Sequence, residues 1–203
     1  MRDLLAALAG VIAFYGYIPY GIDIVRGKVR PARSARIMLT LLLLVTLLQQ
    51  RDLGSGWLLS ITVGEVVGAL GILVLGIRKG MGGLSIIDVV CYVLLAIDLG
   101  LWLSTKHTLL ALHLSILADF IAFTPTLVKT WRHPWTETPL YFMTMVIASP
   151  LNIIAIGTYR YSIVVFPAYL GVINLLEVIV IFYRQHRIPM PHGRLSQDHQ
   201  PLN

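Results

Sequence analysis

Hydrophobic residues fill seven long stretches of this chain, and short polar segments separate them. The stretches cover residues 4–25, 37–50, 57–77, 84–103, 109–128, 140–158 and 162–183. Most are close to the roughly 20 apolar residues that a helix needs to cross a bilayer. The second is shorter, and we expect its helix to begin near Ser34. The pattern predicts an all-α membrane protein with seven transmembrane helices, whose short connections make consecutive helices antiparallel neighbours.

The composition supports a membrane as the surrounding medium. Of the residues, 57% are hydrophobic and only 13% are charged, with a mean hydropathy of +0.78. A soluble domain carries about a quarter charged residues, so this chain has too few to cover itself in water. The single cysteine, Cys91, lies in the fourth stretch and excludes both a disulfide within the chain and a cysteine-based metal site.

The net charge of +6 comes from cations that lie almost entirely in the connections, which favours an orientation signal over a nucleic-acid partner. One side of the predicted membrane collects Arg26, Lys28, Arg30, Arg33, Arg36, Arg78, Lys79, Lys129, Arg132, Arg184, Arg187 and Arg194. The other side holds Arg2, Arg51, Lys106 and Arg160. Cytoplasmic loops are enriched in Lys and Arg. We therefore expect an integral protein of a bacterial inner (plasma) membrane, with the N-terminus outside and the C-terminus in the cytoplasm.

The stretch around Pro19 returns, in register and without a gap, around Pro125. Leu4, Leu8, Phe14, Pro19 and Arg26 match Leu110, Leu114, Phe120, Pro125 and Arg132, and Tyr17 aligns with Phe123. Three crossings reverse the direction of the chain and a fourth restores it. The repeats are therefore parallel, related by an axis along the membrane normal. The sequence predicts a first triple-helix bundle (1–80), an inversion linker helix (81–107), a second triple-helix bundle (108–186) and a disordered cytoplasmic tail (187–203).

This arrangement of two three-helix bundles and a linker, with a proline in the first helix before a basic loop, resembles the PQ-loop superfamily, which includes the SWEET sugar transporters. The Pro-Gln pair of that family stands here as Pro19-Tyr20 and Pro125-Thr126. The resemblance implies a pore between the two bundles, alternating access, a small polar solute, and a central pocket on the third and seventh helices. It also extends to seven-helix membrane receptors and sorting proteins, which do not transport.

Polar groups at depth are the best candidates for function, because a charge at a helix centre costs roughly 2.5–3.5 kcal/mol and should face a bundle interior or a cavity. The candidates are Glu65, Asp98, His113, Asp119, Asn152, Asn174 and Glu177. We expect Glu65, Asp119, Asn152, Asn174 and Glu177 to line the substrate pathway. His113 is typical of a hydrogen-bonded packing residue. Asp23 and Asp88 lie near the basic helix ends and are expected to form ion pairs.

Asp119 stands in a polar stripe of Ser115, Asp119, Ala122 and Thr126, which share one helical face. It either binds a proton or solute in the pathway or holds two helices together by a hydrogen bond. Pro125 removes a backbone N–H nearby. Together with Pro19 and Pro150, it is a candidate hinge for the rocking of one bundle against the other.

Glycines mark the same two helices that the resemblance assigns to the pocket. Gly64, Gly68 and Gly71 share a face of the third, and Gly171 lies near Asn174 on the seventh. They indicate either room for a ligand or close helix packing, and both can hold together.

The predicted function is transport or facilitated passage of a small polar solute, with proton coupling at Asp119 or without it. The alternatives are a receptor or sorting protein on the same fold, and a structural subunit of a larger complex. All four lysines lie in connections, which excludes a retinal Schiff base, and no hydrolase, metalloprotease or phosphate-loop motif is present. We therefore expect neither an enzyme nor a cofactor. The basic loop with Arg26, Lys28, Arg30, Arg33 and Arg36 is a solvated orientation signal or a site for anionic lipid headgroups.

The charge distribution generates a topology prediction. A fluorescent protein fused after Asn203 should fluoresce in a bacterial host, because the tail is expected in the cytoplasm, where such proteins fold. A reporter active only in the periplasm should be silent at the same position. A dark fusion together with an active periplasmic reporter would reverse the orientation.

Overall fold

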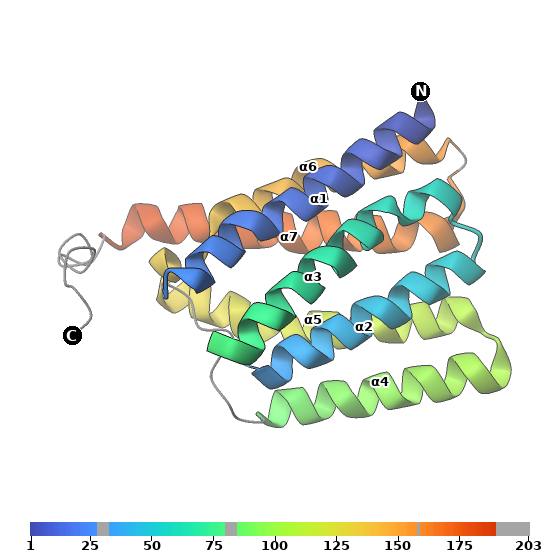
Figure 1. Cartoon of the computed structure of the whole chain (residues 1–203), viewed down its shortest axis with the longest axis horizontal. Coiled ribbons are helices and arrows are strands. Elements are labelled where there is room, and N and C mark those ends of the chain that lie inside the picture. Colours follow the sequence, from blue (N-terminus) through green and yellow to red (C-terminus); the bar gives the residue numbers. More distant parts are fainter. Residues whose placement is uncertain (28–32, 80–84, 158, 190–203) are drawn as a thin grey trace.

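The structure, a computed structural model, describes residues 1–27, 33–79, 85–157 and 159–189. These residues form seven α-helices, two short 3-10 helices and no strand (Figure 1). The elements are α1 (Arg2–Val25), α2 (Arg33–Asp52), η1 (Gly56–Leu58), α3 (Leu59–Lys79), α4 (Ile86–Thr105), α5 (Thr108–Arg132), η2 (Pro134–Thr136), α6 (Pro139–Ile156) and α7 (Tyr161–Arg187). The all-α class and the predicted helices are confirmed. Of the predicted disordered tail (187–203), Arg187 is instead the last residue of α7, and residues 190–203 lie outside the described residues.

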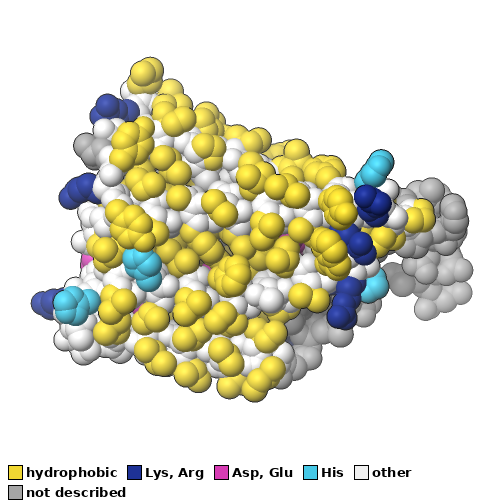
Figure 2. Space-filling model, turned by 180° about the vertical axis from the view of Figure 1, so that it is seen from behind, with side chains coloured by type: hydrophobic (Ala, Val, Ile, Leu, Met, Phe, Trp, Pro, Cys, Tyr) yellow, Lys and Arg dark blue, Asp and Glu magenta, His cyan; other side chains and the backbone are white. Residues whose placement is uncertain are grey.

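Among the described helices, all except α2 are long and apolar enough to cross a membrane. α2 has 20 residues, the same number as α4, and starts at Arg33, as expected from the position of Ser34. Its ends are polar, with Arg33 and Arg36 in the first turns and the pair Gln49-Gln50 in the last. Figure 2 shows hydrophobic side chains covering the middle of one face of the molecule, with Lys and Arg side chains gathered toward its two ends. These features are those of an integral membrane protein.

Consecutive helices pack along one another in only half of the cases. α2 packs on α3, α4 on α5 and α6 on α7, whereas the other three consecutive pairs make little or no contact in the described residues. Instead, α3 contacts both α1 and α2, and α7 contacts both α5 and α6. The expectation that all consecutive helices are neighbours is wrong, because a third helix lies between α1 and α2 and between α5 and α6. The two sets meet where α1 packs on α6 and α2 packs on α5, and α4 lies outside against α5 and α2 (Figure 1).

Small residues set the closest helix contacts. A side chain at Gly64 of α3 would collide with the backbone of Gly10 in α1, and one at Gly16 of α1 would collide with Thr144 of α6. The space beside Gly68 is filled by the ring of Tyr17. Small residues let helix backbones approach closely in a membrane. At Gly64 and Gly68 the structure therefore supports the packing interpretation of the glycines.

A buried polar junction attaches α4 to its neighbours. Gln49 of α2 donates from Nε2 to Asp98 Oδ1 of α4 at 2.7 Å. The hydroxyl of Ser115 in α5 donates to the Asp98 carboxylate, and its oxygen also lies 3.1 Å from Gln49 Oε1. All three side chains are almost completely inaccessible. Since buried polar groups must find partners, this junction fixes how α2, α4 and α5 face one another.

The α1–α3 contact yields a stability prediction. Gly64→Ala should destabilise the protein by about 1–3 kcal/mol, because the added methyl group overpacks a contact made by the backbone. Gly71→Ala, on the same helix with no atom within 4 Å of the new methyl group, should leave stability unchanged. The measurement is thermal unfolding of both variants in detergent. Equal losses of thermal stability would show that the close contact is not responsible.

Candidate functional site

A cavity of about 390 Å³ extends from one end of the molecule into its middle, lined by residues from all seven helices. The end at which it begins is called the basic end here. It contains the C-termini of α1, α3, α5 and α7 and the N-termini of α2, α4 and α6. Described cations at this end include Arg26, Arg33, Arg78, Lys129 and Arg132. The cavity has a polar mouth, aromatic walls and an acidic floor.

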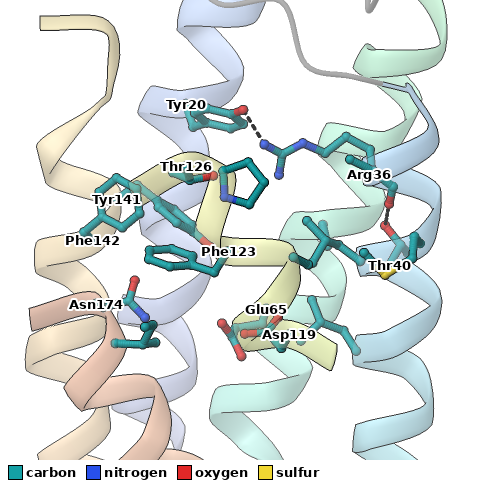
Figure 3. Close-up of a pocket in the computed structure, with 18 of the residues that line it drawn as sticks. Tyr20, Arg36, Thr40, Glu65, Asp119, Phe123, Thr126, Tyr141, Phe142 and Asn174 are labelled. Atoms are coloured by element: carbon teal, nitrogen blue, oxygen red, sulfur yellow. Dashed lines mark hydrogen bonds between the residues drawn. The ribbon is translucent and has the colours of Figure 1, made fainter. Parts of the chain in front are cut away.

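Two cations line the mouth, and each has a partner. Arg36 of α2 donates to the hydroxyl of Tyr20 in α1, with its guanidinium carbon 5.0 Å from the centre of the tyrosine ring. Lys129 of α5 forms an ion pair with Glu137, just before α6. Figure 3 shows the first of these contacts, which connects α2 to α1 at the mouth.

Arg36 therefore contacts the cavity wall, although it was one of the candidates for lipid contact. Of the other loop cations in that set, Arg26 and Arg33 are exposed. Lys28 and Arg30 lie outside the described residues.

Hydroxyl groups, rather than arginines, contact Asp23 and Asp88, the two carboxylates expected to form ion pairs near the basic helix ends. Thr138 donates to Asp23 Oδ2 at 2.8 Å, which joins α6 to α1. Ser34 donates to Asp88 Oδ2 at 2.8 Å, and Asp88 also forms a capping box with Ser85 at the start of α4. The expected ion pairs of Asp23 and Asp88 are thus replaced, in the described residues, by hydrogen bonds that position helix ends.

Aromatic rings form the middle of the cavity. Tyr141 of α6 meets Tyr17 of α1 edge-on, with ring centres 5.0 Å apart, and their hydroxyl groups lie 3.3 Å from each other. Phe123 of α5 meets Phe142 of α6 in a second edge-to-face pair at 6.2 Å. Tyr17 and Phe123, which align in the sequence repeat, therefore line the same cavity.

Two carboxyl groups form the floor, as Figure 3 shows. Glu65 of α3 is only 3% exposed, and its Oε2 has no hydrogen-bond partner in the described part of the chain. Asp119 of α5 accepts a hydrogen bond of 2.6 Å from the hydroxyl of Tyr169 in α7. The two carboxyl groups also interact electrostatically with each other. Within the described ranges, no cluster of three His, Cys, Asp or Glu side chains could hold a metal ion.

Three of the five predicted pathway residues share this cavity. Glu65, Asp119 and Asn174 line it, and Asn174 also donates to the carbonyl of Leu170 one turn earlier in α7. Asn152 lies outside it, buried where α6 faces Ser60 of α3.

Glu177 also lies outside the cavity. It is fully buried and accepts a hydrogen bond from Thr130 of α5. Although Asn174 and Glu177 are three residues apart on α7, one faces the cavity and the other faces a neighbouring helix. Helical spacing places residues on a face but does not say what covers it.

The polar stripe of the fifth helix is divided in the same way. Asp119, Ala122 and Thr126 line the cavity, whereas Ser115 belongs to the junction with Asp98. His113 bonds the carbonyl of Leu109 and the hydroxyl of Tyr161, each at 2.6 Å, in agreement with a packing role.

The candidate hinges lie inside continuous helices. Pro19 is in α1, Pro125 in α5 and Pro150 in α6, and Pro125 lines the cavity. Pro167, buried inside α7, is a fourth interior proline that the hinge prediction overlooked. Its position within the seventh hydrophobic stretch was the available signal.

Sequence reasoning also missed the partners of the floor and mouth. Tyr169 holds Asp119, and Tyr20 holds Arg36, but tyrosines are common in membrane helices and nothing in their spacing marks them.

Comparison of the chain with known protein families, with curated protein sequences and with solved structures gave no match in any of the three. The resemblance to the PQ-loop superfamily therefore stays a prediction from the sequence, based on the expected helix arrangement and on Pro19 and Pro125.

Proposed function

We propose that this protein moves a small polar solute across a membrane by alternating access. The observation that carries the proposal is a cavity that begins at the basic end and stops, midway along the helices, at Glu65 and Asp119. Ionisable groups inside a membrane are costly and mark solute or proton pathways. A cavity open to one side and ending near the midplane is what one state of an alternating-access transporter requires.

The proposed moving parts are two bundles, α1–α3 and α5–α7, with α4 as the linker. Two contacts support this division: α3 lies against both α1 and α2, and α7 lies against both α5 and α6. The bundles would meet through α1 with α6 and through α2 with α5. Pro19, Pro125 and Pro150, with Pro167, would supply flexible points, since a proline inside a helix removes one backbone hydrogen bond.

The side of the membrane from which the cavity is open follows from the loop charges. With the basic end in the cytoplasm of a bacterial cell, the cavity faces inward. Toward the opposite end, the buried residues Ala13, Ile61, Leu112 and Phe166 belong to the apolar core, which also extends past the cavity to Ile24. Rocking of the bundles would separate these four residues and bring Arg36 and Tyr20, on the first bundle, closer to Lys129 and Glu137, on the second.

Asp119 is the proposed proton carrier. Its carboxyl group is held by Tyr169, so it connects α5 to α7 at the floor, where solute and proton would meet. Protonation would remove the negative charge and weaken that hydrogen bond, because hydrogen bonds to charged groups are roughly twice as strong. Loading of the proton would thus bias the packing of the second bundle.

Alternating access predicts that a residue at the floor is reachable from both sides of the membrane. Ala69 lines the cavity one turn from Glu65, and Cys91 is buried and can be replaced to give a background without other thiols. Ala69→Cys in Cys91→Ala protein should react with a membrane-impermeant thiol reagent from either side, measured in vesicles of both orientations.

Side controls for this labelling are Arg26→Cys at the basic end and Asp52→Cys at the opposite end, which should each react from one side only. Reaction of Ala69→Cys from the basic side alone would exclude alternating access. That result would favour a receptor that binds its ligand without moving it.

Proton coupling is tested with Asp119→Asn, which keeps the size of the side chain and its ability to accept from Tyr169 but cannot titrate. In proteoliposomes, uptake of a solute that the wild type accumulates along a pH gradient should fall to equilibration, while exchange of the same solute persists. Wild-type accumulation by Asp119→Asn at every pH tested would remove Asp119 from the coupling mechanism. A wild type that only equilibrates the solute would identify a passive facilitator.

A further inference from the structure

The floor of the cavity carries acidic groups that no described cation balances. Glu65 and Asp119 both lie there, and among the described residues neither carboxylate forms an ion pair. The described cations that line the cavity are Arg36 and Lys129, and both lie at the mouth. Each already has a partner there, Tyr20 for Arg36 and Glu137 for Lys129. The charge at the floor is therefore available to a ligand.

One carboxyl oxygen of Glu65 also has no hydrogen-bond donor among the described residues. Its side chain is 3% exposed, and no described residue donates to its Oε2. A buried carboxyl oxygen without a donor is costly, and native proteins rarely leave one unsatisfied. Asp119 receives one hydrogen bond, from Tyr169 to Oδ2, so its second oxygen can accept from a ligand. A group with several N–H donors and a positive charge would satisfy both carboxylates.

The aromatic walls favour the same kind of group. Tyr17, Tyr141, Phe123 and Phe142 line the cavity between mouth and floor, and their rings can attract a cation that lies within about 6 Å of the ring centre. The mouth already contains such a contact, since the guanidinium of Arg36 lies 5.0 Å from the ring of Tyr20.

The size of the cavity favours an organic cation over a bare metal ion as the ligand. The cavity volume of about 390 Å³ is within the range of about 300–1,000 Å³ typical of small-molecule sites. Four aromatic rings line the cavity between mouth and floor, and within the described ranges no group of three His, Cys, Asp or Glu side chains could hold a metal ion. A compact molecule with one cationic group and a short carbon chain fits this combination of acidic floor and apolar wall.

We infer that the solute is a small organic cation, whose ammonium or guanidinium group binds between Glu65 and Asp119 and whose carbon chain lies against the aromatic walls. This inference rests on the proposed function in treating the bound molecule as a transported solute. Binding of the cation can nevertheless be measured without measuring transport. The N–H groups would donate to the free oxygen of each carboxylate. Asn174, on the neighbouring wall, would contact the remainder of the molecule.

The test compares four probes that share one carbon chain and differ in a single group. They are 4-amino-1-butanol, 4-guanidino-1-butanol, the neutral 1,4-butanediol and the anionic 4-hydroxybutanoate. Binding to the full-length protein in nanodiscs is measured by calorimetry. At least one of the two cations should bind, and it should bind at least about tenfold more tightly than the diol or the anion, as expected when charge-assisted hydrogen bonds are lost.

Variants then assign the binding to the floor. Glu65→Gln should weaken binding of the cation about tenfold or more and leave the weak binding of the diol unchanged, whereas Glu65→Asp keeps the charge and should retain part of the affinity. Asp52→Asn, on an exposed carboxylate at the opposite end, should bind as the wild type does. Thermal unfolding without probe shows whether each variant is folded. If Glu65→Gln does not fold, Asp119→Asn takes its place with the same expectation.

Binding of the diol as tight as that of the cations, absence of binding by both cations, or cation binding that Glu65→Gln and Asp119→Asn leave unchanged would overturn the inference. These outcomes are separate from failure of the transport proposal. A protein that binds the cations at Glu65 but exposes Ala69→Cys to one side only is a receptor for organic cations. A protein whose floor is reached from both sides but prefers the diol is a transporter of another solute.

Discussion

Every polar group placed at depth in this protein has to find a partner or a water-accessible cavity, because the bilayer offers neither. Asp98 meets this requirement through Gln49 and Ser115, and one carboxyl oxygen of Glu177 meets it through Thr130. Both lie in contacts between helices and fix which helices are neighbours. Glu65 and Asp119 meet it differently, by facing a cavity. The same constraint therefore divides the buried polar residues into those that hold the helices together and those that are available to a ligand.

The connections of the chain explain why the cavity begins at one end only. At the end opposite the basic one, each connection joins two helices that pack along each other: α2 with α3, α4 with α5, and α6 with α7. At the basic end the connected helices are not packed on each other, so the ends of α1 and α2, and of α5 and α6, are held apart. Arg36 with Tyr20 bridges the gap between α2 and α1, and Lys129 with Glu137 bridges the gap between α5 and α6.

Small residues and aromatic residues together fill the interior. Gly10 and Gly64 let α1 and α3 touch through their backbones, and Gly16 lets α1 approach α6. This brings Tyr17 against Gly68 on one side and against Tyr141 on the other. The wall of the cavity is thus a consequence of the close packing of α1, since a larger residue at Gly68 would displace the ring that lines it.

The sequence by itself determined the helices, their approximate ends, the membrane as their surroundings and the set of polar residues at depth. These follow from local properties: runs of apolar residues, flanking cations and the spacing of side chains along a helix. It did not determine that Glu65, Asp119 and Asn174 share one cavity while Asn152, Glu177 and Ser115 do not. Helical periodicity assigns each residue to a face, but only the packing of non-consecutive helices decides whether that face meets a neighbour or an open space.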